Sequence, residues 1–210
     1  MSQLGSAKII GGIGVLLSLL AIIPYAGALL SLIGIVMIFI AVNYIADETK
    51  NHKIFQDYLM NFIFQIIAIV AIIIIMIAAF GISGGLTWIT SLQGQNITDF
   101  NSVWNTFGTM IAGCIAALLI AWIFLILGAI YLRKSYNSIA EHTKVNLFKT
   151  TGTVYLIGAV TLIVVVGVVI IFVAKILELV SYFSLPETLP IQPTTPPTTV
   201  PPPQPPSSSP

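Results

Sequence analysis

The side chains that could do chemistry in this chain are few. Only His52 and His142 offer an imidazole, and each has an acidic neighbour: Glu48 lies four residues before the first and Glu141 directly before the second. Imidazole and carboxylate groups suit several transition metals, but this spacing matches none of the paired-histidine motifs that define metal sites. We therefore predict solvated surface residues here, with no metal site, no cofactor and no enzymatic activity.

Two further polar features lie near or within apolar stretches. Lys175 and Glu178 are three residues apart, so they can pair on one helical face, and we place them at the outer end of the last span. Ionisable residues inside a membrane usually mark ion or proton pathways, so this placement disfavours a proton-coupled pump. Gln65 is the deepest amide in any predicted span. It is the best candidate among the span residues for lining a pore, but a hydrogen bond between helices is the preferred interpretation of this residue.

The composition identifies the environment in which these residues act. Hydrophobic residues make up 57% of the 210 positions and charged residues only 7%, whereas about a quarter of a soluble domain is charged. A net charge of +1 gives no basic field that could hold nucleic acid. One cysteine, Cys114, cannot form an internal disulfide. The chain is therefore predicted to be an integral membrane protein.

Long stretches without charged residues hold the predicted spans, because a bilayer core about 30 Å thick needs roughly 20 helical residues. The stretch from Ile9 to Ala46 is interrupted by Pro24 and Gly27, which predicts a helical hairpin rather than one long helix. A kinked single helix would reduce the count to four. We expect an all-α polytopic transmembrane helix bundle with about five spans, in a domain of residues 1–185. The predicted spans are residues 5–23, 26–46, 60–80, 106–132 and 151–174.

Basic residues gather on one side of this five-span arrangement, which predicts a cytoplasmic N-terminus in a multi-pass protein of the cell membrane. Lys175 alone falls on the other side, together with the C-terminal tail, which we predict to be extracellular. The basic residues on the cytoplasmic side are Lys8, Lys50, Lys53, Arg133, Lys134, Lys144 and Lys149.

The segments predicted to be outside carry features of secreted chains. The loop at residues 81–105 contains Asn96-Ile97-Thr98, the chain's single match to the N-glycosylation triplet, with Asn96 as the acceptor. Residues 186–210 contain eleven prolines with many Thr and Ser residues, so a disordered, extended tail is predicted. The spacing of Pro190, Pro193 and Pro196 also fits a ligand of a proline-reading domain, but that interpretation requires a cytoplasmic tail.

Small residues on the fourth span predict close helix packing. Two ribbons at four-residue spacing would let another helix approach, either within the bundle or in a dimer. They are Gly108, Ala112 and Ala116, and Gly113, Ala117 and Ala121.

The next segment, Arg133 to Lys149, has a partial apolar stripe and is predicted to form a short helix along the cytoplasmic interface. Leu132, Tyr136, Ile139, Ala140, Thr143 and Leu147 form this stripe.

Several strings resemble a known family. Gly11-Gly12-Ile13-Gly14, the run from Ala41 to Asp47 (AVNYIAD) and, in the second half, YLRKSY at Tyr131–Tyr136 and LFKTTG at Leu147–Gly152 are similar to archaeal and bacterial membrane proteins of domain-of-unknown-function family 996. LIGA at 156–159 and YFSLP at 182–186 extend the resemblance, which covers Lys8 to Pro186 but matches poorly across residues 81–105. It implies a membrane bundle and no particular chemistry.

A short internal similarity is also present. Residues 34–41 (GIVMIFIA) and 167–174 (GVVIIFVA) share five of eight residues, a weak indication of a duplicated span of the kind found in some transporters.

Two functional hypotheses follow from these patterns. The first is a non-enzymatic structural or accessory subunit whose partners are the lipid bilayer and either a second copy or another membrane protein. The second is a channel or facilitator for a small neutral solute, supported by Gln65, the glycines and the internal similarity.

Overall fold

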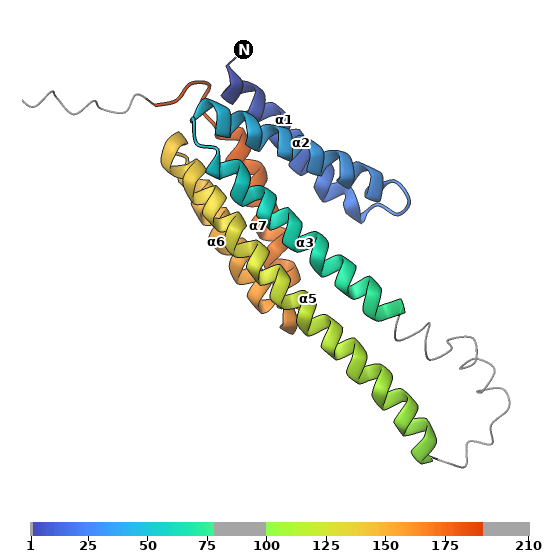
Figure 1. The fold of residues 1–210 in the computed structure, drawn as a ribbon. Coiled ribbons are helices and arrows are strands. Elements are labelled where there is room, and N and C mark those ends of the chain that lie inside the picture. Colours follow the sequence, from blue (N-terminus) through green and yellow to red (C-terminus); the bar gives the residue numbers. More distant parts are fainter. Residues whose placement is uncertain (1, 78–99, 191–210) are drawn as a thin grey trace, which may run out of the picture.

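The computed structural model describes residues 2–77 and 100–190, and the regular structure in these ranges is entirely helical (Figure 1). The predicted all-α bundle is therefore confirmed for the described chain. Asn96 and the tail from residue 191 lie outside the described residues. The helices, in chain order, are α1 (Gln3–Leu19), η1 (Leu20–Ile22), α2 (Gly27–Glu48), α3 (Lys53–Ile77), α5 (Phe100–Thr143), α6 (Asn146–Thr161), η3 (Leu162–Val164) and α7 (Val166–Phe183).

These helices pack as three antiparallel hairpins, α1 with α2, α3 with α5, and α6 with α7. Among the described residues, five helices are long and apolar enough to cross a membrane, and Gln3–Leu19 is slightly shorter. The chain is thus a multi-pass membrane protein with the predicted number of long spans. The set differs, however, because residues 146–164 and 166–183 count as two helices where the sequence predicted one.

The first hairpin has the turn that Pro24 predicted, so the alternative of one kinked helix is wrong. Helix η1 ends at Ile22, Tyr25 has a φ of 66°, and α2 begins at Gly27. Beyond the turn the two helices touch through glycines. A Cβ on Gly34 would meet the carbonyl oxygen of Gly14 and the amide nitrogen of Ser18. Only residues without side chains allow this backbone contact.

The predicted span at residues 151–174 is wrong, because the chain reverses in the middle of it. Val165 has a φ of 65°, which ends η3 and starts α7 in the opposite direction. Residues 162–166 contain no proline or glycine, so the local residue types do not indicate this turn. The reversal is held by a second glycine contact, since a Cβ on Gly167 would meet the carbonyl oxygen of Gly158 and the amide nitrogen of Leu162.

This second reversal brings the two described ends of the chain together. The Ser2 hydroxyl donates a hydrogen bond to the backbone carbonyl of Glu187, and both residues lie at the same end of the bundle (Figure 1). The predicted five-span arrangement would place Ser2 and Glu187 at opposite ends of the bundle. The structure places them at the same end, because the turn at Val165 adds a reversal that the sequence analysis did not include.

The segment predicted to lie along the interface is instead the end of α5, a continuous helix of 44 residues, together with the start of α6. Its apolar stripe was identified correctly, because Tyr136, Ile139, Ala140 and Thr143 are all buried. They pack into the core of the bundle rather than onto lipid. Tyr136 meets Phe148 of α6 edge to face at 5.5 Å, and Phe148 meets Tyr182 of α7 at 5.2 Å. The core is therefore densest at the end that carries the termini.

Candidate functional site

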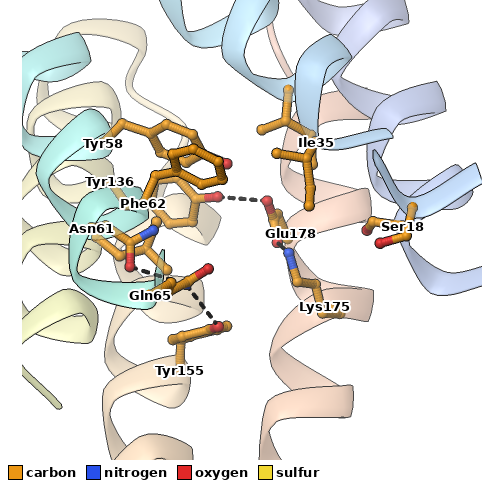
Figure 2. Close-up of a pocket in the computed structure, with 13 residues that line it drawn as sticks. Ser18, Ile35, Tyr58, Asn61, Phe62, Gln65, Tyr136, Tyr155, Lys175 and Glu178 are labelled. Carbon is orange, nitrogen blue, oxygen red and sulfur yellow. Dashed lines mark hydrogen bonds and ion pairs between the residues drawn. The ribbon is translucent and has the colours of Figure 1, made fainter. Parts of the chain in front are cut away.

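A polar cavity of about 190 Å³ lies between the α1–α2 hairpin and the other four long helices (Figure 2). The α1–α2 side contributes Ser18, Ser31, Ile35 and Ile38. The other side contributes Tyr58, Asn61, Phe62 and Gln65 from α3, Leu132 and Tyr136 from α5, Tyr155 from α6, and Lys175 and Glu178 from α7. Polar groups of six helices therefore face the cavity, in a protein with few polar groups in its spans.

An ion pair forms the charged part of this site. Lys175 Nζ donates a hydrogen bond of 2.8 Å to Glu178 Oε2, and the Tyr136 hydroxyl donates one of 2.6 Å to Glu178 Oε1. The Glu178 side chain is 2% exposed and that of Lys175 is 28% exposed. Both carboxylate oxygens are thus engaged and enclosed, while the Lys175 side chain is less buried and lines the cavity.

The ion pair lies deeper in the bundle than the level of Arg133. This corrects the prediction that placed it at the outer end of a span. Gly152 packs on Arg133, and the neighbouring Thr151 hydrogen-bonds Ser181 at 3.1 Å, so these residues share one level of the bundle. Glu178 and Lys175 follow three and six residues deeper along α7. At a rise of 1.5 Å per residue they lie about 5 and 9 Å below that level.

Gln65 lies in the same cavity as this ion pair (Figure 2). Its Nε2 donates to Asn61 Oδ1 at 3.2 Å and to the Tyr155 hydroxyl at 3.4 Å. Gln65 therefore makes an interhelical hydrogen bond and lines a cavity at the same time, so both interpretations of this residue describe part of its surroundings. Its Oε1 is the atom left to accept a hydrogen bond from a bound molecule.

The site is electrically neutral as a whole but offers mainly hydrogen-bond donors. Lys175 and Glu178 cancel in charge, and the other polar lining groups are hydroxyls and amides. The ion pair uses one of the three N–H donors of the ammonium group, and both oxygens of the carboxylate are already accepting. Ionisable groups held within a membrane bundle are a functional-site hypothesis by default. Such an arrangement can bind a small polar molecule through its oxygen atoms.

The other residues singled out from the sequence lie elsewhere. Ala117 and Ala121 are buried in the bundle, whereas Ala112 and Ala116 are exposed and a Cβ on Gly108 or Gly113 would meet no atom within 4 Å. The ribbon of Gly113, Ala117 and Ala121 therefore packs into the bundle through its two alanines. The ribbon of Gly108, Ala112 and Ala116 faces outward.

The two histidines do not meet. His52 Nδ1 is 3.9 Å from Asp47, and His142 Nδ1 is 2.8 Å from the carbonyl oxygen of Ser138. Within residues 2–77 and 100–190, no three His, Cys, Asp or Glu side chains gather as a metal site would require.

Sequence reasoning missed the site because it predicted one span over residues 151–174. It therefore missed the turn at Val165, which brings Lys175 and Glu178 back into the bundle. The signal that could have found them is the similarity between residues 34–41 and 167–174. Gly34 and Gly167 occupy the same place in their hairpins, each against a carbonyl of the preceding helix. Treating α7 as a counterpart of α2 would have placed a turn before Gly167 and the ion pair inside the bundle.

The fold and the cavity define a polytopic α-helical membrane protein with a neutral, ion-paired polar site. The sequence model described as protein of unknown function (DUF996) matches residues 30–176, and the chain belongs to this family. The chain is also 34% identical over 189 residues to an uncharacterized protein of Methanocaldococcus jannaschii, a match covering 89% of this chain and 96% of the relative. No solved structure matches the chain. The resemblance recognised in the sequence is thereby confirmed.

Proposed function

We propose that this protein is a non-enzymatic facilitator that binds a small polar solute of no net charge in the cavity between the α1–α2 hairpin and the other helices. The single observation that carries the proposal is the ion pair Lys175–Glu178, enclosed in a cavity of about 190 Å³ with Gln65, Asn61 and Tyr155. A buried pair of charges contributes little net stability compared with apolar packing, so its presence supports a binding role. A solute without net charge leaves the neutral site neutral.

The arrangement of the hairpins supports a way for such a solute to pass. The α1–α2 hairpin contacts the rest of the bundle chiefly through α1 with α7 and α2 with α3, and the cavity lies along this seam. A shift of this hairpin against the other helices would change which end of the cavity is open. The mobile unit is then α1–α2, and the solute-binding unit is α3 together with α5, α6 and α7.

Flux into proteoliposomes tests this function. Vesicles containing the purified chain should swell in a panel of small uncharged solutes, such as urea, glycerol and acetamide, faster than empty vesicles. Gln65→Leu should slow the flux, because it removes the polar group at the deep end of the α3 lining. Lys149→Met, which changes an exposed lysine of α6, is the matched control. Absence of flux for every solute of the panel and for acetate, from correctly folded protein, would exclude the facilitator.

We also propose an orientation in the cell membrane, with both termini in the cytoplasm. The basic residues outside the cavity support it, since Lys8, Lys50, Lys53, Arg133, Lys134, Lys144 and Lys149 all belong to the end of the bundle that carries the termini. Lys175 is the one basic residue that the sequence analysis placed on the opposite side. It lies inside the bundle, so it does not contribute to the charge bias that sets the orientation.

A structural or accessory role is the second candidate, and one feature of α5 favours it. Ile111, Ile115 and Leu118 are 54%, 53% and 62% exposed, on the same stretch of helix as the open positions Gly108 and Gly113. A second copy of the chain could pack there through small residues. Native mass spectrometry in mild detergent should then show a dimer that Ala116→Trp disrupts. A strictly monomeric protein would exclude this role.

A further inference from the structure

The identity of the solute can be narrowed by asking which groups of the cavity are available to it. Glu178 has both oxygens occupied and a side chain that is only 2% exposed, so a cationic group of a solute could reach it only by displacing Lys175 from Oε2. Lys175 is 28% exposed and retains two N–H donors. The charged group that the site offers is therefore the ammonium, and its natural partner is a small oxyanion such as a carboxylate.

Charge balance then restricts how the oxyanion can be held. The empty site is neutral, and a bare carboxylate would add one negative charge among apolar helices, where an unbalanced charge is costly. Glu178 can remove that charge by taking one proton. We propose that the uncharged load of this cavity is a small monocarboxylate together with one proton, the carboxylate bound by Lys175 and the proton carried by Glu178. This inference rests on the proposed function.

The exchange uses only groups already in contact. The hydrogen bond from Lys175 Nζ to Glu178 Oε2 breaks, and the ammonium donates instead to a carboxylate oxygen of the solute. One proton taken up from the buffered solvent forms an O–H bond at Glu178 Oε2, and that O–H donates to the second oxygen of the same carboxylate. The Tyr136 hydroxyl continues to donate to Oε1. The sum of charges at the site is zero before and after binding.

The surroundings of Glu178 limit which other groups could take up the proton. The titratable groups that face it are Lys175 and Tyr182 of α7, Tyr136 of α5, Tyr58 of α3 and Tyr155 of α6. The lining residues of α1 and α2 are serines and isoleucines, which do not titrate. Glu178 is the only carboxyl group among these cavity residues of the described chain.

The volume sets the size of the solute. A cavity of about 190 Å³ corresponds to about six water molecules at a liquid volume of roughly 30 Å³ each. A carboxylate of about four to six non-hydrogen atoms therefore fits. The Gln65 amide oxygen, which lines the same cavity, can accept a hydrogen bond from a hydroxyl on a longer solute.

Calorimetry on the purified full-length chain tests the inference. Acetate is titrated at pH 7.5 in two buffers that differ in ionisation enthalpy, so that the heat reports proton uptake. We expect close to one proton taken up per acetate bound, and an affinity that falls about tenfold per pH unit as protons become scarce. Acetamide and glycine are titrated alongside, as a neutral and a zwitterionic compound of similar size.

Two variants assign the roles. Glu178→Gln should bind acetate without proton uptake and without pH dependence, because an amide is permanently uncharged, and Lys175→Met should not bind it. Glu141→Gln and Lys149→Met make the same chemical changes at exposed positions and should behave like the unaltered chain. Because Lys175→Met leaves Glu178 unpaired, its folding is checked by size-exclusion chromatography, and the Glu178→Gln result stands independently.

Each remaining outcome decides between the two proposals. Acetate binding without proton uptake in the unaltered chain, or the same uptake in Glu178→Gln, would overturn the carboxylate-plus-proton inference. Binding of acetamide or glycine but not acetate would also overturn it, while leaving the facilitator intact. If none of the three compounds binds and the solute panel shows no flux, both proposals fail.

Discussion

The first and last hairpins of this protein share a backbone arrangement but differ in what it contains. In each, a glycine of the second helix rests on a carbonyl of the first, Gly34 on Gly14 and Gly167 on Gly158. Counting from these glycines, Ile45 of α2 corresponds to Glu178 of α7, and both are almost fully buried. One hairpin fills that position with an apolar side chain and the other with a carboxylate. Small residues therefore set the geometry, and a few substitutions on the same face set the chemistry.

The largest expected effect concerns the side from which the two hairpins enter the membrane, and it is all or none. In a Cys114→Ala background, single cysteines at Ser2 and Glu187 should both be shielded from an impermeant thiol reagent in intact cells, because these residues are in contact. A cysteine at Ser91, between α3 and α5, should be labelled. Opposite labelling of Ser2 and Glu187 would show that the hairpins do not enter from one side.

The next effect tests whether the glycine contacts hold both hairpins. Gly34→Leu and Gly167→Leu should each prevent accumulation of folded protein, because even a Cβ would overlap backbone atoms, a change that costs more than about 4 kcal/mol. Gly113→Leu is the matched control, since that position is open. Fluorescence-detected size-exclusion chromatography measures the outcome. Tolerance of leucine at one glycine alone would show that the two contacts are not equivalent.

Removing one charge from the last hairpin tests how it differs from the first. Lys175→Met should lower the stability by about 3 kcal/mol, because it leaves a buried carboxylate without its charged partner. The double variant Lys175→Met, Glu178→Leu makes this face apolar, like Val42 and Ile45 of α2, and should regain most of the loss. Thermal unfolding in detergent reports both values. A double variant no more stable than the single one would contradict this comparison.

The smallest effect concerns the turns, where each hairpin places a residue other than glycine at positive φ. Tyr25 has a φ of 66° and Val165 one of 65°. A β-branched residue is the more strained in this region, so Val165→Gly should raise the apparent Tm by about 2 to 4 °C. Tyr25→Gly should raise it less. The reverse order would mean that the turns are stabilised by contacts of the valine side chain.

The turns also explain how much of the fold could be predicted. The first turn contains Pro24 and Gly27, two residue types that favour turns by their own backbone properties. Its position was therefore predicted to within a few residues. The turn at Val165 is made by an aliphatic residue and depends on the contact between Gly158 and Gly167, which are nine positions apart. Local pattern cannot show a contact that exists only once both helices have formed.

The candidate site was predictable only in part, for the same reason. Gln65 was identified from its depth in a span that the structure confirms. Lys175 and Glu178 were recognised as a pair, but their location depends on the direction of α7 and hence on the turn at Val165. Tyr136 was predicted as part of an apolar stripe, and its role as a hydrogen-bond donor to Glu178 requires three helices to be in place.

The turn at Val165, which contains no proline or glycine, also has a consequence for biosynthesis. To the insertion machinery, residues 150–174 present one uncharged stretch of about the length of a single span. The finished protein divides this stretch between two antiparallel helices. If a nascent chain inserted this stretch as one span, Lys175 and the residues after it would end on the opposite side of the membrane from their place in the folded protein. We therefore expect the α6–α7 hairpin to enter the bilayer as a unit.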